Sequence, residues 1–486
     1  MNMRHVQFPG PILEMVAAAE GAVRQIPPAF PLTATVAVNP WLGQSEQSRE
    51  DAATRMARTT GARIARPRPE LAAMIEDGRI HVDELVAAAS ALGMEAEALR
   101  AAAFRPAERV DPLPTVADLA AEATGTGWPD FVAERIGLWA ATHYDRGQAL
   151  WPAPSGGAFA SWRAFAMRDL TPGLFGLPGL PARIAALPDE PRLAFAAACE
   201  VLALDPAAAP LYFHRLLATL DGWAQMVRGR GWLAERDGGE DGDAFTLLTV
   251  RFLWDVALLE AYPDLALPWA NAQAAYAASI EPVEDQRIDM ALQEAADRSA
   301  ERRLAAIFAE PRRAATKTRP AIQAAFCIDV RSEIFRRALE SADDGVETIG
   351  FAGFFGLAVT HHAAASDTKE VRGPVLLAPG LAADARIPAA DDLSGRIRAR
   401  SVRAWNRFKM ATVSAFAFVE AAGPLYVAKL IRDALGQRKD APDPPPPHLG
   451  MAADDRPDAA AGILRAMSLT SNFAPVVLIA GHGARV

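Results

Sequence analysis

The sequence contains very little cysteine. Cys199 and Cys327 are the only two in 486 residues, and they lie far apart among apolar neighbours. A disulfide-stabilised scaffold is therefore excluded, and the composition suits the reducing cytoplasm. Because apolar surroundings raise the pKa of a thiol and suppress its reactivity, we expect Cys199, which lies inside an apolar helical stretch, to be an inert core residue.

Long uninterrupted apolar runs are also missing. Residues 1–9 contain no apolar core of the kind found in export signals. The two most apolar stretches, residues 193–211 and 413–431, each contain charged residues and a proline, whereas a membrane-spanning helix needs about 20 mostly apolar residues. We therefore predict that any role at a membrane is carried out from outside the bilayer.

An excess of basic residues is absent as well. The formal net charge is −9 and the basic residues are scattered along the chain, which argues against nucleic acid as the main partner. An apolar fraction of 51% can fill substantial cores, and the length is sufficient for two or three domains.

The sequence pattern divides the chain into two regions. Residues 1–315 are predicted to be mainly helical, with apolar helical stretches at 193–203, 211–228 and 245–262. Beyond the basic loop near 312–319, short apolar runs alternate with helical patterns, so residues 316–486 are predicted to form an α/β domain. The residues of the helical region suggest no chemistry, and we interpret it as a docking region for a partner.

The most informative stretch begins at residue 321. An apolar run from Ala324 to Val330 predicts a buried strand, and the residues after it have helical spacing. Side chains alternate across a strand, so Cys327, Asp329 and Arg331 are expected to leave the same face at its carboxyl end. Ser332 is expected to cap the helix that follows.

This trio of side chains has a definite chemical use. A thiolate and a carboxylate both bind zinc, and a nearby arginine can compete with the metal for the carboxylate. Cys-x-Asp-x-Arg is also the pattern of β-class carbonic anhydrases. The alternative, which the stretch by itself leaves open, is a buried cysteine that packs as a small hydrophobe beside an Asp–Arg pair.

The end of the chain carries a second informative pattern. Residues 473–480 predict a buried strand of the parallel type, and Gly481, His482 and Gly483 follow it. Glycines on either side of a histidine allow the backbone to approach a metal closely. A histidine there and Cys327 at another strand end of the same domain predict a shared zinc site.

Two adjacent histidines, His361 and His362, are less informative. Neighbouring residues of a regular element point in different directions, so we do not expect both to bind one metal. We interpret this pair as part of a polar loop.

Five segments taken together resemble the DabA family of inorganic carbon transporter subunits. They occur in the family's order along nearly the whole chain, and the third is the most specific. The segments are Ala-Val-Asn-Pro-Trp (37–41), Asp-Arg-Gly-Gln-Ala-Leu-Trp-Pro (145–152), Cys-Ile-Asp-Val-Arg-Ser-Glu (327–333), Ile-Gly-Phe-Ala-Gly-Phe-Phe-Gly (349–356) and Val-Val-Leu-Ile-Ala-Gly-His-Gly (476–483).

The resemblance implies an α/β fold with a core like that of β-class carbonic anhydrases, built on a central and largely parallel sheet. It implies that Cys327, Asp329 and His482 are zinc ligands and that Arg331 draws Asp329 off the metal. It also implies a DabB-type membrane partner of the proton-antiporter family. The chain itself is then expected to be a peripheral protein on the cytoplasmic side of the inner membrane.

One departure from the family concerns the metal site. The family supplies a second cysteine ligand a short way beyond the Gly-His-Gly loop, whereas this sequence stops at Val486. Cys199 matches no family ligand. We expect either that the sequence is an amino-terminal fragment of a longer protein, which we favour, or that another polypeptide completes the site.

The function that the resemblance implies is energy-coupled, one-way hydration of CO2 to bicarbonate, with Asp329 and Arg331 acting as a gate. Two alternatives remain open at this point. The chain could be a free-standing carbonic anhydrase of the β-class type or another zinc hydrolase. It could also be a non-catalytic subunit whose fold is held together by zinc.

Overall fold

The computed structural model describes residues 8–31, 36–37, 41–107, 110–144, 156–310, 319–352, 355–366, 369–373, 379–410 and 445–481. The chain forms two compact units. The first contains most of the chain up to residue 313, and the second contains residues 314–486 with two short earlier segments.

The first unit is built from helices. They are α1 (Gly10–Gln25), α2 (Arg49–Thr60), α3 (Arg68–Glu76), α4 (Val82–Ala91), α5 (Ala96–Ala103), α6 (Val116–Thr124), α7 (Trp128–His143), α8 (Ala158–Ala166), α9 (Thr171–Leu174), α10 (Leu180–Ala186), α11 (Pro191–Leu202), α12 (Ala209–Ala218), α13 (Gly222–Arg236), α14 (Asp243–Ala261), α15 (Ala266–Ala277) and α16 (Glu284–Ala309). Short 3-10 helices, η1 (Leu42–Gln44) and η2 (Pro263–Leu265), lie between them. Two short strands, β1 (Phe30–Pro31) and β2 (Val36–Ala37), pair with each other, and β2 is counted with the second unit.

Local sequence explains where several helices begin and end. The side chain of Thr115 accepts a hydrogen bond from the backbone N–H of Asp118, and the Asp118 carboxylate accepts one from the N–H of Thr115. This reciprocal pair satisfies N–H groups that have no partner within α6. The same helix ends at Gly125, whose φ of 71° is a left-handed conformation that glycine adopts without strain.

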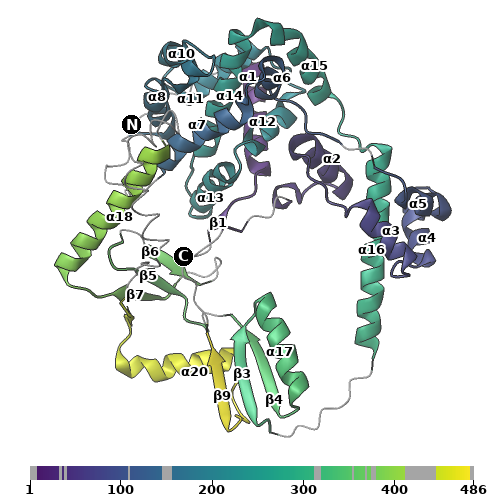
Figure 1. Cartoon of the computed structure of the whole chain (residues 1–486), viewed down its shortest axis with the longest axis vertical. Coiled ribbons are helices and arrows are strands. Elements are labelled where there is room, and N and C mark those ends of the chain that lie inside the picture. The colour runs from purple at the N-terminus through teal and green to yellow at the C-terminus, as the bar shows by residue number, and fades with distance from the viewer. Residues whose placement is uncertain are drawn as a thin grey trace, which may run out of the picture. The chain divides into compact units, whose positions relative to one another are not determined.

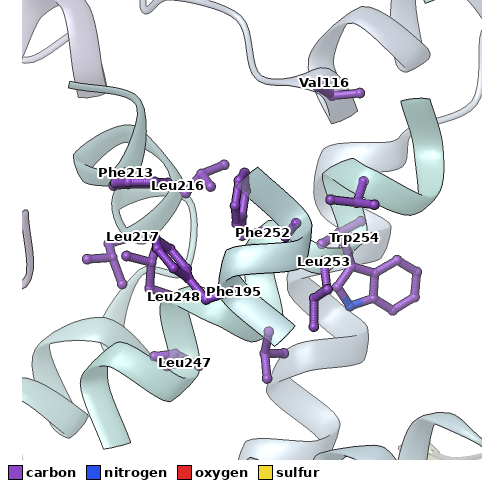
Figure 2. Close-up of a cluster of buried hydrophobic side chains, with 14 of the residues drawn as sticks. Val116, Phe195, Phe213, Leu216, Leu217, Leu247, Leu248, Phe252, Leu253 and Trp254 are labelled. Carbon is purple, nitrogen blue, oxygen red and sulfur yellow. The ribbon is translucent and has the colours of Figure 1, made fainter. Parts of the chain in front are cut away.

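The main core of the helical unit surrounds α14. This helix is buried from Ala244 to Leu258, so apolar side chains leave it in nearly every direction. Figure 2 shows Phe252 of α14 close to Phe195 of α11 and Phe213 of α12, and the ring centroid of Phe195 is 5.6 Å from that of Phe252. A helix that is apolar all round must be central, which explains why the other helices pack around it.

A buried ion pair lies within this core. Arg251 and Asp255 are 1% and 0% exposed, and Nη1 of Arg251 is 2.6 Å from a carboxylate oxygen of Asp255. Arg251 also donates to the hydroxyl of Thr219, and the hydroxyl of Tyr212 donates to Asp255. Because each charge has a partner and further hydrogen bonds, the cost of burying the pair is offset.

A second, smaller core forms where α16 contacts α3, α4 and α5. Leu71, Leu85, Leu99 and Leu292 are almost fully buried there. Arg68 at the start of α3 binds two carboxylates of α16, those of Asp285 and Asp289, and so holds this group of helices together.

The second unit is α/β, as the sequence predicts. Its elements are β3 (Ile322–Cys327), α17 (Val330–Ala342), β4 (Val346–Phe351), β5 (Val359–His362), β6 (Lys369–Arg372), β7 (Leu381–Ala385), α18 (Ala389–Met410), β8 (Pro447–Leu449), η3 (Ala453–Asp455), α20 (Arg456–Ala466) and β9 (Val476–Ala480).

The described strands from β3 to β9 form two small sheets, and a core like that of β-class carbonic anhydrases stays a prediction. In the first, β3 lies between β4 and β9 and is parallel to both, so the strand order is β4-β3-β9 (Figure 1). In the second, with the order β6-β5-β7-β8, only the β5–β7 pairing is parallel. The first sheet is therefore the only one of the two that is wholly parallel.

The first sheet carries a helix on each face. Phe326 of β3 contacts Phe335 of α17, with ring centroids 5.4 Å apart. Ala325 points to the opposite face, where it packs with Met467 and with Ile463 of α20. The helix after β3 and the helix before β9 consequently lie on opposite faces of the sheet.

The prediction for residues 473–480 is partly wrong. β9 is a strand and is parallel, as predicted, but it is not buried, because it lies at the edge of the sheet. The continuous apolar run that suggested burial is a property of strands covered on both faces. Here the run lies in a strand whose faces are open.

None of the helices in the described ranges combines the length and the apolar character that a bilayer crossing requires. The apolar stretch at 193–211 belongs largely to α11 and the start of α12. The stretch at 413–431 lies outside the described residues.

We predict that Asp255→Ala lowers the free energy of unfolding of the helical unit by about 3–5 kcal/mol, since it leaves the Arg251 guanidinium buried without a counter-charge. Urea unfolding followed by far-UV circular dichroism measures this loss. The control is Glu97→Ala, which removes an exposed pair with Arg100 and should cost less than about 1 kcal/mol. Equal losses in the two variants would contradict the assignment.

Candidate metal site

The candidate site lies where β3 ends. Cys327 is the last residue of β3 and pairs with Phe351 of β4. The backbone N–H of Ile328 still donates to the carbonyl oxygen of Phe351, at 3.0 Å. α17 begins two residues later, at Val330, so the strand turns into a helix within a very short segment.

Asp329 is the residue that makes this turn. It is the N-cap of α17, and its Oδ1 accepts hydrogen bonds from the backbone N–H groups of Arg331, at 2.8 Å, and Ser332, at 3.1 Å. The prediction that Ser332 caps the helix is therefore wrong. Because the strand ends at Cys327 and not at Val330, the helix begins earlier than predicted and Ser332 lies inside its first turn.

The predicted alternation of side chains does not extend past Cys327 for the same reason. Asp329 and Arg331 belong to the start of a helix, so they do not leave the face of a strand. Arg331 nevertheless reaches back to Asp329. Its Nη2 is 2.6 Å from Oδ2, and its Nε is 3.3 Å from Oδ1 and 3.2 Å from Oδ2.

The electrostatics of this pair favour a charged carboxylate. Hydrogen bonds from the Arg331 side chain, and then from the backbone N–H groups of Ser332 and Arg331, hold the pKa of Asp329 well below its usual range. The side chain of Arg331 is 84% exposed and that of Asp329 is 25% exposed. A metal that uses Asp329 as a ligand must therefore displace a partner that faces water.

Three strand ends meet at the edge where Cys327 lies. β3, β4 and β9 are parallel, and Phe326 is paired with Ala480, so Gly481 follows β9 at the same edge. Phe355, which follows β4, is close to Gly481, since a Cβ added to this glycine would be 3.6 Å from the phenylalanine ring. α17 and α20 lie on opposite faces, and α/β sheets usually bind ligands at the carboxyl edge at such a point.

A complete metal site is not observed among the described residues. No group of three or more histidine, cysteine, aspartate and glutamate side chains within them is arranged to hold a metal. His482 lies outside the described residues. The structure brings Asp329 and Arg331 together and places Cys327 at the same edge, and the ligand set of Cys327, Asp329 and His482 stays a prediction.

The donor types predicted for this site fit zinc. A thiolate and an imidazole are the ligands that zinc prefers, and a carboxylate is an accepted further ligand. In the conformation described, both carboxylate oxygens of Asp329 are bonded to Arg331.

The other cysteine and the paired histidines can now be placed. Cys199 is 4% exposed, which confirms that it lies in the core, and burial raises the pKa of its thiol to about 12. His361 and His362 are in strand β5, opposite Glu370 and Lys369 of β6, so the prediction of a polar loop is wrong. Their pairing partners come from strands that the local pattern does not reveal.

The contact that fixes α17 to the sheet leaves little trace in the sequence. Arg336 of α17 donates to the hydroxyl of Thr348 in β4, at 3.1 Å. A Cβ on Gly350 would lie only 2.6 Å from Nη1 of Arg336 and 3.2 Å from Ile328, so a larger residue there would displace the guanidinium from its present position. A glycine inside a strand is the available signal, because it often marks such a close approach.

Comparison with known proteins identifies the family. A family model described as "Probable inorganic carbon transporter subunit DabA" matches residues 19–486. The chain belongs to the DabA family. No solved structure matches it.

Several curated DabA relatives are similar over almost the whole chain. The protein from Rhodopseudomonas palustris (strain BisB5) is 48% identical over 498 residues, which cover 100% of this chain and 62% of the relative. That from Roseobacter denitrificans is 48% identical over 479 residues, or 97% of this chain and 60% of the relative. Both bear the description of a probable inorganic carbon transporter subunit, and the chain spans about three-fifths of their length.

We predict that Asp329→Ala destabilises the first turn of α17 by about 0.5–2 kcal/mol, because two backbone N–H groups lose their acceptor. Hydrogen exchange of α17 measures the effect. Ser332→Ala keeps the backbone N–H that the cap uses and should change the exchange rates little. A larger effect of Ser332→Ala than of Asp329→Ala would show that the Ser332 side chain caps the helix, as the sequence predicts.

We also predict that, with a chelator present to remove zinc, iodoacetamide modifies the native chain at Cys327 and not at Cys199. Cys199 is buried and its thiol has a raised pKa, whereas Cys327 is partly exposed at the edge of a sheet. Peptide mass spectrometry after a short exposure identifies the modified residue. Modification of both cysteines at similar rates would show that the core around α11 opens readily.

Proposed function

We propose that this chain is the zinc-dependent subunit of an energy-coupled inorganic carbon pump, which hydrates CO2 to bicarbonate in one direction. The chain belongs to a family whose description names an inorganic carbon transporter subunit, and this supports the substrate class. The donor types at the carboxyl edge of the first sheet support the chemistry.

One observation carries most of the proposal. The parallel pairing of β3 with β9 brings Cys327 and Gly481, from two distant parts of the sequence, to one edge of a sheet. His482 is the next residue in the sequence. A thiolate and an imidazole from these two segments are the donors with which we propose that the chain holds zinc, with Asp329 as a further ligand.

Zinc held by Cys327 and His482 would lower the pKa of a bound water and so supply hydroxide for the attack on CO2 at neutral pH. The chain itself determines whether the Asp329 carboxylate binds Arg331 or the metal. While Arg331 holds the carboxylate, Asp329 is kept from acting as a ligand. When the hydrogen bonds between Arg331 and Asp329 break, the carboxylate is available to bind the metal and block the site. We therefore propose that this pair acts as a gate.

The exposure of Arg331 suits it to this role. Arg331 faces water, so its ion pair with Asp329 is screened by solvent and can break and re-form readily. A partner that binds close to Arg331 can therefore change the state of the gate through modest contacts.

We propose that the partner is a DabB-type membrane subunit of the proton-antiporter family, and that this chain binds it at the cytoplasmic side of the inner membrane. The word "subunit" in the description of the relatives supports the existence of a partner. Coupling the gate to cation movement through such a partner would make hydration one-way and cause bicarbonate to accumulate.

We predict that Cys327→Ala lowers the zinc content of the purified chain by at least about tenfold, because it removes a thiolate ligand. Metal analysis by mass spectrometry measures this, and Cys199→Ala is the control that should retain zinc. Arg331→Ala should retain zinc but abolish inorganic carbon uptake in cells that also make the membrane partner.

Each outcome distinguishes the proposal from its alternatives. Retained uptake in Arg331→Ala would remove Arg331 from the gate. Hydration of CO2 by the purified chain without a partner would favour a free-standing carbonic anhydrase. Zinc that is bound and lost as predicted, without any effect on uptake, would favour a purely structural metal.

A further inference from the structure

The edge strand β9 is unusually apolar for its position. Val476, Val477, Leu478 and Ile479 are 54%, 38%, 49% and 46% exposed. Successive side chains of a strand point to opposite faces, so both faces of β9 are open. In the central strand β3, by contrast, Ala324 is 0% exposed.

The register shows what surrounds each open face. Val476 and Leu478 are paired with Ile322 and Ala324 of β3, so they lie on the face that carries α17. α17 contacts β3 and β4 and leaves Phe335 55% exposed. This face therefore presents an apolar strip beside α17, made of Ile322, Val476, Leu478 and Phe335.

The opposite face is open in the same way. Val477 and Ile479 are paired with Gln323 and Ala325, on the face that carries α20. Met467 and Leu469 cover Ala325, and this small core does not include the residues of β9. Among the described residues, one helix lies on each face, and both leave the β9 side of the sheet uncovered.

A strand of this kind belongs inside a sheet. Parallel strands that are apolar on both sides are normally covered by helices on both faces, and natural edge strands are protected by charges, bulges or short length. β9 has no charged residue, and about half of its backbone groups point away from β3. The curated relatives are longer than this chain, which spans 62% of the first of them.

We propose that β9 is an interior strand of a wider parallel sheet in the full-length proteins of this family. A further parallel strand pairs with the free edge of β9, and an amphipathic helix covers the strip formed by Ile322, Val476, Leu478 and Phe335. Both come from the part of the family's length that this chain does not span. The carboxyl edge with Cys327 then lies in the middle of the sheet, flanked by strands on both sides.

Hydrogen exchange followed by mass spectrometry tests this proposal. It is measured on this 486-residue chain and on the full-length relative from Rhodopseudomonas palustris (strain BisB5), with a chelator present so that zinc does not affect the result. In this chain, about half of the amides of residues 476–480 should exchange at least about 100-fold faster than those of residues 322–327. In the relative, the segment aligned with β9 should be as protected as the segment aligned with β3.

An internal control separates this effect from a general difference in stability. β5 lies inside the second sheet, between β6 and β7, so residues 359–362 and the aligned segment should be equally protected in the two proteins. Equal exchange of the β9 segment in both proteins would overturn the proposal. So would protection of β9 in this chain that increases with concentration while sedimentation shows a dimer, because a second copy would then cover the edge.

Discussion

The parallel pairing of β3 with β9 is the interaction on which the candidate site depends. The two strands are about 150 residues apart in sequence, so closing the intervening chain has an entropic cost. Contacts near the starts of the two strands help to offset it. Nε of Arg319 donates to the carbonyl oxygen of Phe473, and the buried Oε1 of Gln323 accepts the N–H of Ala474. With the strand starts fixed in register, their carboxyl ends must coincide as well.

At that edge, one carboxylate has several partners that compete for it. Asp329 caps α17 with Oδ1 and pairs with Arg331 through both oxygens. The helix cap and the ion pair with the exposed Arg331 are each weak interactions, so neither holds the Asp329 side chain strongly in place. The pKa of Asp329 is low because all of these partners favour the charged form. Asp329 therefore stays ionised, while the group that its carboxylate binds can change.

The sequence predicted the elements of the site better than their boundaries. An apolar run followed by helical spacing was enough to predict β3 and α17. The boundary was misplaced by three residues because Asp329 can end a strand by accepting two backbone N–H groups, and an apolar run does not show which side chain does so. The strand at His361 and His362 was missed for another reason. It is stabilised by pairing with β6 and β7, and such long-range pairing leaves no local signal.

The error over the burial of β9 has a different character, because there the local pattern and the surroundings disagree. Val476, Val477, Leu478 and Ile479 form the pattern of a strand covered on both faces, yet each is at least 38% exposed. The apolar pattern of a strand is adapted to its surroundings in the whole protein, including segments that are distant from it in the sequence. The exposed apolar strand therefore carries information about the sheet of the longer family members, and it indicates that the edge with Cys327 is enclosed there more fully than in this span alone.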